Sequence, residues 1–146
     1  MGSTRLGLVV AGSLGWVAAV LLAPLLPGGA VPAAVYLVGG LVCHQQADRS
    51  FHLDGAQVAV CARCLGLYAG GAIGTVLWSL VRRRARWPGL GVRGPLAVLA
   101  APTIGSVALG TLGWWDAGNV ARAGLAVPLG VAAGVLVAAA AVGDLR

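Results

Sequence analysis

The sequence predicts an all-α protein, a polytopic bundle of four or five transmembrane helices that forms a single integral membrane domain over residues 1–146. The first observation behind this prediction is composition: 59% of the residues are hydrophobic and only 10% are charged, and the mean hydropathy is +0.91. These values lie far outside the range of soluble domains. The second is that apolar runs of about 20 residues recur, the length that crosses the hydrocarbon core of a bilayer. We therefore expect a lipid bilayer around almost every segment.

The expected spans are five apolar segments, which cover residues 6–26, 31–45, 58–81, 95–113 and 120–142. The first is too long for the hydrophobic region of a signal peptide and has no convincing cleavage site after it, so we expect a retained helix. The second is short, because at about 1.5 Å per residue roughly 15 residues cross only about 20 Å. It is therefore either a short span or a re-entrant half-helix.

The three later spans carry features that indicate their ends and their packing. The third follows a polar segment at residues 44–57 and has Cys61, Arg63 and Cys64 in its first turns. The fourth ends in two tryptophans, which is typical of the aromatic belt at a membrane interface. The fifth is rich in Ala, Gly and Val, and small residues let membrane helices approach closely. The same packing role is expected for a glycine series in the third span: Gly66, Gly70, Gly71 and Gly74.

The charged residues indicate the orientation of the bundle. Ten arginines stand against four aspartates, with no lysine or glutamate, and give a formal charge of +6. Half of the arginines lie in one short stretch: Arg82, Arg83, Arg84, Arg86 and Arg93. Cytoplasmic loops of membrane proteins are enriched in basic residues, so we expect loop 82–93 to be cytoplasmic. Topology thus accounts for the basic charge, and no nucleic-acid partner is expected.

A cytoplasmic loop at this position determines on which face of the membrane the other polar segments lie. The third span then runs inward, so its first turns and segment 44–57 lie at the extracytoplasmic face. The fourth span returns to that face and brings Asp116, Asn119 and Arg122 with it. The N-terminus lies outside if all five segments span the membrane, and inside if the second one re-enters. The unusual polar residues share one face in both cases.

The three cysteines and both histidines lie close together in the sequence, at this face. Cys43, His44, Cys61 and Cys64 supply three thiols and an imidazole, and His52 is a second candidate nitrogen. The C-x-x-C spacing lets two sulfurs face one ligand, and Cys43 can return to them across the polar segment. Three thiolates and an imidazole suit tetrahedral zinc, and iron uses similar ligands. We therefore predict a zinc or iron site with Cys43, His44, Cys61 and Cys64 as ligands.

Two other functions and one inert interpretation remain open. Cys61 and Cys64 could form a thiol-disulfide oxidoreductase pair, because a helix N-terminus and the neighbouring Arg63 lower thiol pKa values. Cys43 would then be a resolving thiol and a quinone the electron carrier. The small size and the Gly and Ala faces also fit a noncatalytic accessory subunit of a larger membrane complex. In the inert interpretation the cysteines are small apolar packing residues.

Four further residues are candidates for binding a cofactor beside the cysteines: Arg63, Tyr68, Asn119 and Arg122. An unpaired charge such as that of Arg63 is costly in a membrane, and it usually pairs or binds an anion. Tyr68 follows the C-x-x-C motif by one turn, within hydrogen-bonding reach of the site. Arg49 and the aspartates are expected to be ordinary interfacial charges.

These motifs together resemble a known family. The strings Cys43-His44-Gln45 and Arg49-Ser50-Phe51, then Val60-Cys61-Ala62-Arg63-Cys64 with Gly66 and Tyr68, are similar to the signature of domain-of-unknown-function family 2085, a group of prokaryotic predicted membrane proteins. The similarity is strongest over residues 43–74. A second, weaker block contains Asn119, Arg122 and Gly124.

The fourth span departs from the family pattern, since Ile104 and Gly105 stand where an Asp-Gly pair and a following Gln are expected. The resemblance implies a small polytopic protein of the bacterial or archaeal cytoplasmic membrane with a Cys and His site. It implies no particular activity.

Overall fold

The computed structural model describes residues 2–82 and 93–144 and confirms the all-α prediction. Its helices are α1 (Gly2–Leu22), α2 (Ala30–Gly40), α3 (Ala62–Val81), α4 (Arg93–Thr111) and α5 (Asn119–Val142). Two single-turn 3-10 helices, η1 (Ala23–Leu25) and η2 (Ala47–Arg49), lie in the connections. Most of the basic loop, residues 83–92, lies outside the described residues.

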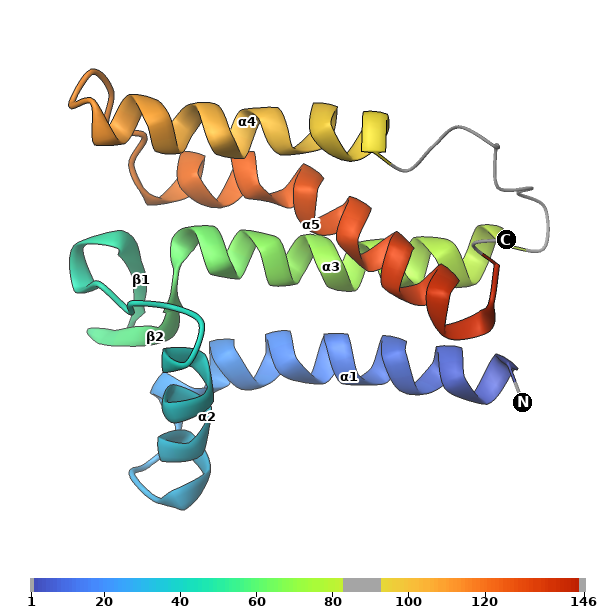
Figure 1. Cartoon of the computed structure of the whole chain (residues 1–146). Helices are drawn as coiled ribbons and strands as arrows, with labels where there is room; N and C mark the ends of the chain where they lie inside the picture. Colours follow the sequence, from blue (N-terminus) through green and yellow to red (C-terminus); the bar gives the residue numbers. More distant parts are fainter. Residues whose placement is uncertain (1, 83–92, 145–146) are drawn as a thin grey trace.

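Four helices of the described chain, α1 with η1, α3, α4 and α5, are long and apolar enough to cross a membrane. They lie side by side, with α3 and α5 pointing one way and α1 and α4 the other (Figure 1). The N-terminus, the end of α3, the start of α4 and the end of α5 therefore gather at one end of the bundle. The connections that carry the cysteines gather at the opposite end (Figure 1).

The second expected span, residues 31–45, forms a short helix and a loop. Helix α2 has 11 residues and ends at Gly40. It lies across the end of α1 instead of alongside the other helices (Figure 1). A glycine near the end of this helix lets it pack closely against β2: a Cβ on Gly39 would lie 2.7 Å from the Ala59 carbonyl oxygen. The chain then turns into the loop that carries Cys43.

The second half of the polar segment 44–57, together with the four residues after it, forms a β-hairpin of strands β1 (Ser50–Leu53) and β2 (Ala56–Cys61). Its two turn residues, Asp54 and Gly55, have φ values of 50° and 81°. Asp-Gly with both residues left-handed is the sequence preference of a tight type I′ turn.

The third helix consequently begins at Ala62, four residues later than the expected start near Val58. Val58, Ala59 and Val60 are fully buried in strand β2 and pack in a core with Val20 of α1. Their apolar character reflects this small core at the end of the bundle, which periodicity alone cannot distinguish from the start of a membrane helix.

Helices α3 and α5 pack with their backbones almost in contact, which confirms the packing role expected for the glycines. A Cβ on Gly70 would lie 2.4 Å from the Val127 carbonyl oxygen. In the reverse direction, a Cβ on Gly130 would lie 2.4 Å from the Leu67 carbonyl oxygen. Both distances are far below van der Waals contact, so only glycine fits at these positions without moving a helix.

We predict that Gly130→Ala destabilises the protein by about 1–3 kcal/mol, because the added methyl group must push α3 and α5 apart. The matched control is Gly124→Ala on the same helix, where a Cβ meets nothing within 4 Å. Unfolding by denaturant in detergent micelles measures the difference. Equal stability of the two variants would contradict the close packing.

Candidate metal centre

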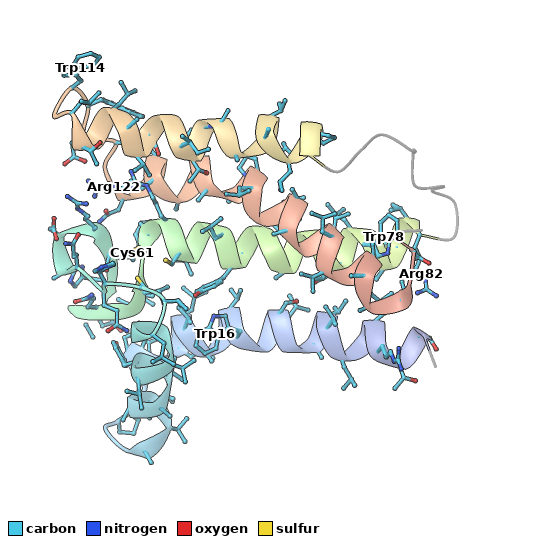
Figure 2. The ribbon with its side chains drawn as sticks, viewed as in Figure 1. Trp16, Cys61, Trp78, Arg82, Trp114 and Arg122 are labelled. Carbon is cyan, nitrogen blue, oxygen red and sulfur yellow. The ribbon has the colours of Figure 1, made fainter. Side chains whose placement is uncertain are left out.

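The three cysteines converge from three different elements at one end of the bundle. Cys43 lies in the loop after α2, Cys61 is the last residue of β2, and Cys64 lies in the first turn of α3. Their sulfur atoms all lie within 4.8 Å of one another, and all three thiols are free. Cys61 marks this end in Figure 2, whereas Trp78 and Arg82 lie at the other end. The sequence expectation that Cys43 returns to the C-x-x-C pair is confirmed.

The sulfur of Cys43 is held by the backbone. Cys43 is buried, and its Sγ accepts hydrogen bonds from the backbone N–H groups of Cys61, at 3.1 Å, and Gln45, at 3.4 Å. These two N–H donors hold the sulfur in place beside Cys61. Strand β2 therefore both positions Cys61 and supplies one of these donors.

Two glutamines hold the Cys43 loop against the hairpin. The Gln45 side-chain amide donates to the carbonyl oxygens of Tyr36, at 2.8 Å, and Ala59, at 2.7 Å. Gln57 donates to the carbonyl oxygen of Gln45 at 2.6 Å. These positioning roles were not expected from the sequence, where the available signal was two amides in the polar segment between Cys43 and Cys61.

The sulfur atoms line a cavity of about 330 Å³. Among its other lining residues are His44, Arg49 and Arg63. His44 is exposed, and its nitrogens lie outside the close group of three sulfurs. His52, the second candidate nitrogen, is exposed on β1 and does not line this cavity. The structure thus brings three of the four predicted ligands together and places the fourth at the cavity wall.

Only one of the four predicted cofactor-binding residues lines the cysteine cavity. This residue is Arg63, whose guanidinium Nη2 donates to the Ser106 carbonyl oxygen of α4 at 3.2 Å. Tyr68 is partly buried and packs against the core cluster that contains Cys43, with its ring edge-to-face against Trp16 at 5.9 Å. Both aromatic rings therefore support the site from within the bundle.

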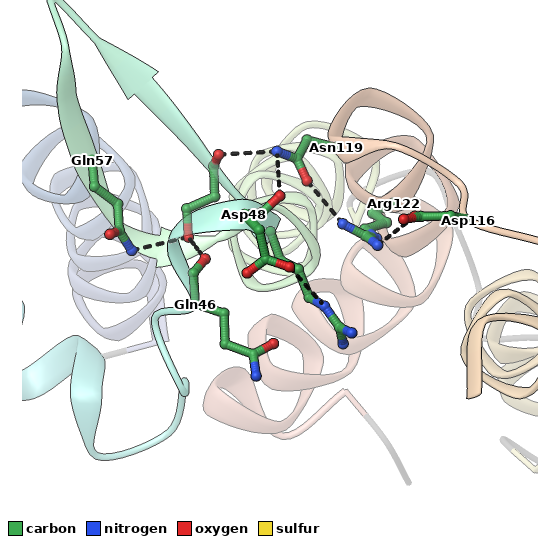
Figure 3. Close-up of polar contacts among 8 residues, drawn as sticks. Gln46, Asp48, Gln57, Asp116, Asn119 and Arg122 are labelled. Carbon is green, nitrogen blue, oxygen red and sulfur yellow. Dashed lines mark hydrogen bonds and ion pairs between the residues drawn. The ribbon is translucent and has the colours of Figure 1, made fainter. Parts of the chain in front are cut away.

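Asn119 and Arg122 connect α5 to the hairpin (Figure 3). Neither residue lines the cysteine cavity. The Asn119 amide donates to the Ser50 carbonyl oxygen at 3.0 Å, and its Oδ1 accepts from Arg122 Nη1 at 3.1 Å. Arg122 Nη2 pairs with Asp116 at 2.5 Å. These bonds fix the start of α5 beside the strands.

The neighbouring thiols make Cys61 acidic. A hydrogen bond from the Cys64 thiol is the largest cause and lowers the pKa of Cys61 to about 5, from an ordinary value of 9.0, while partial burial opposes the shift. Cys61 also stands at the N-cap of α3, where the helix dipole favours an anion. Cys61 is therefore readily converted to its thiolate.

Comparison with known proteins gives a family and one curated relative. Residues 43–136, well over half of the chain, match the family described as predicted membrane protein (DUF2085). Over 53 residues the chain is 38% identical to the uncharacterized protein MJ1492 of Methanocaldococcus jannaschii, a match that covers 36% of this chain and 34% of that protein. The chain thus spans about a third of the length of this relative. No solved structure matches.

We predict that alkylation of Cys61 by iodoacetamide, followed by mass spectrometry of its peptide after chelator treatment, reaches its full rate well below pH 9. Only the thiolate reacts, and a lowered pKa makes the thiolate the main form at a lower pH. In Cys64→Ala, which removes the largest cause of the shift, the rate should rise only as the pH approaches about 9. Identical pH profiles in the two proteins would contradict this role of Cys64.

Proposed function

This chain belongs to the DUF2085 family of predicted membrane proteins, and we propose that it binds a metal ion through Cys43, Cys61 and Cys64. One observation carries the proposal: three sulfur atoms from three elements lie within 4.8 Å of one another at a common cavity. Membrane helices use cysteine as an ordinary small residue, but packing alone does not require three sulfurs to converge.

The spacing of the sulfurs fits a tetrahedral metal. With Zn–S bonds of about 2.3 Å, two thiolates of such a site lie roughly 3.8 Å apart. The sulfurs are already within 4.8 Å, so contraction by about 1 Å or less completes the geometry. Zinc and iron both take thiolate and imidazole ligands, and we propose one of these two metals. The N–H groups that donate to Cys43 would support its thiolate around the ion.

His44 is the proposed fourth ligand. It follows Cys43 directly and lines the same cavity, and its exposed side chain is free to rotate. Four protein ligands would close the coordination sphere, which is the arrangement of structural zinc sites. Such a site would stabilise the end of the bundle by tying the α2 loop, the hairpin and α3 to one ion.

We predict about one zinc or iron per chain in the detergent-purified protein, measured by elemental analysis. Cys61→Ser should lose the metal, because three remaining ligands bind it much more weakly, and His44→Ala should retain it less tightly. The control is His52→Ala, which removes an imidazole outside the cavity and should leave the metal content unchanged. Absence of metal from the wild-type protein, with two thiols hidden until a reductant is added, would refute the metal site.

A second candidate function, thiol-disulfide exchange, is supported by the lowered pKa of Cys61 beside Cys64. The Cys61 thiolate would attack one sulfur of a partner disulfide, and the other partner sulfur would leave as a thiolate. Cys64 would then attack Cys61 and release the partner, so that two electrons reduce the partner while a Cys61–Cys64 disulfide forms. A membrane quinol is the class of reductant we propose to restore the pair. Absence of metal from the wild-type protein, with two thiols hidden until a reductant is added, would favour this function.

We also propose that the cysteine end of the bundle faces the extracytoplasmic side. The end of α3 and the start of α4, which the basic segment 82–93 joins in sequence, lie at the opposite end of the bundle, together with the N-terminus of α1 (Figure 1). Basic residues concentrate on the cytoplasmic side of membrane proteins. This arrangement corresponds to the alternative in which the second segment does not cross and the N-terminus lies inside.

We predict that a membrane-impermeant maleimide labels a cysteine introduced as His52→Cys in intact cells. A cysteine introduced as Ser3→Cys should be labelled only after lysis. Both positions are exposed and lie at opposite ends of the bundle, so they form a matched pair. Peptide mass spectrometry separates the introduced sites from the native cysteines. The reverse pattern of labelling would invert the proposed orientation.

A further inference from the structure

We propose that Arg49, Arg63 and Arg122 form a binding site for a phosphate group in a second cavity, next to the cysteines. This cavity has a volume of about 340 Å³ and lies where η2, the first turns of α3 and α5, and the end of α4 meet. Arg49 and Arg63 line both this cavity and the cysteine cavity, so the two share a wall. We call the second one the arginine cavity.

The arginine cavity carries an excess of positive charge. Three arginines line it against a single acidic residue, Asp116. This aspartate is already paired with Arg122 at 2.5 Å, and its side chain is 78% exposed. Arg49 pairs with Asp48 at 3.6 Å, but that carboxylate does not line the cavity and is 76% exposed. The lining therefore lacks the negative charge that would balance its guanidinium groups.

Arg63 is the least satisfied of the three. It has no carboxylate partner among the described residues, and its one hydrogen bond is to the Ser106 carbonyl oxygen. Its Nε is buried and has no hydrogen-bond partner within the described part of the chain. A guanidinium has five N–H donors, and a buried donor without an acceptor is costly. An oxyanion in the cavity would supply the charge and the acceptors that the protein does not.

The helices add to this preference for an anion. Arg63 and Arg122 occupy the first turns of α3 and α5, which start at the same end of the bundle (Figure 1). A helix N-terminus carries partial positive charge, which disfavours arginine and favours an acidic residue or a bound anion. Neither first turn contains an acidic residue. Two cations at two positive helix ends are explained if an anion lies between them.

Phosphate fits this site in chemistry and in size. The planar fork of arginine matches phosphate oxygens in pairs of parallel hydrogen bonds. A volume near 340 Å³ is at the small end of ligand pockets, so it accommodates a phosphate group but not a whole lipid. Helix α4 forms one wall of the cavity, and only 6% of its membrane-spanning segment is buried within the bundle. A chain attached to the phosphate could lie along α4 in the bilayer, so the group could belong to a lipid or to a soluble phosphate.

Two binding measurements on the full-length protein test the proposal and separate these two sources. The first titrates inorganic phosphate against the thermal stability of the protein in phosphatidylcholine nanodiscs, with chloride keeping the ionic strength constant. The second measures, by native mass spectrometry, the retention of phosphatidic acid relative to phosphatidylcholine. Arg63→Gln should weaken the binding of at least one probe by about tenfold or more. Arg49→Gln, at an exposed side chain, should weaken it by roughly threefold or more without disturbing the fold.

The matched control is Arg82→Gln, which removes the same charge at the opposite end of the bundle and should change binding less than about twofold. Dependence of inorganic phosphate binding on Arg63 assigns the site to a soluble phosphate, and dependence of phosphatidic acid binding assigns it to a lipid. Cys61→Ser, which removes a proposed metal ligand, should still bind the probe, so this test is independent of the metal site. Failure of both probes to bind, or binding that is equal in wild type and Arg63→Gln, would overturn the proposal.

Discussion

The close approach of α3 and α5 is the constraint on which the site depends. Gly70 and Gly130 bring the two backbones together at distances that any other residue would prevent. In a membrane the helices gain little from the hydrophobic effect, so this packing must come from van der Waals contact between small residues. Because the two helices run in the same direction, the contact also places their first turns side by side (Figure 1). Arg63 on one helix and Arg122 on the other thereby line one cavity.

The β-hairpin lies at the end of the bundle where α3 and α5 begin, and it completes the site (Figure 1). It inserts a small buried core, with Val58 and Val60, between η1 and the start of α3. Polar backbone groups near the membrane need partners, and the side chains of Gln45, Gln57 and Asn119 provide them. These bonds turn a polar connection into a rigid platform, and Cys43 and Cys61 are held on it with their sulfurs facing Cys64.

The charges proposed for the cysteine cavity and the arginine cavity are compatible, because the wall that the two cavities share contains Arg49 and Arg63. Three thiolates around a divalent metal carry one net negative charge, and Arg63, which lines both cavities, would balance it from one side. On its other side the same guanidinium faces the arginine cavity. The proposed metal and the proposed phosphate would therefore lie on either side of Arg49 and Arg63, whose positive charges would balance the negative charge of each.

The sequence alone determined the membrane bundle, the packing role of the glycines, the family and the convergence of Cys43, Cys61 and Cys64. These features follow from composition, residue size and motif spacing, which are local and survive any arrangement of the helices. Only the tertiary structure decided that α2 lies across the bundle and that Asn119 and Arg122 support α5 instead of lining the cysteine cavity. The same holds for Arg49, which the sequence indicated as an interfacial charge and which lines both cavities. The physical reason is that the position of a long polar side chain depends on how each helix is rotated and on where the hairpin docks, and both are set by contacts between residues far apart in the chain.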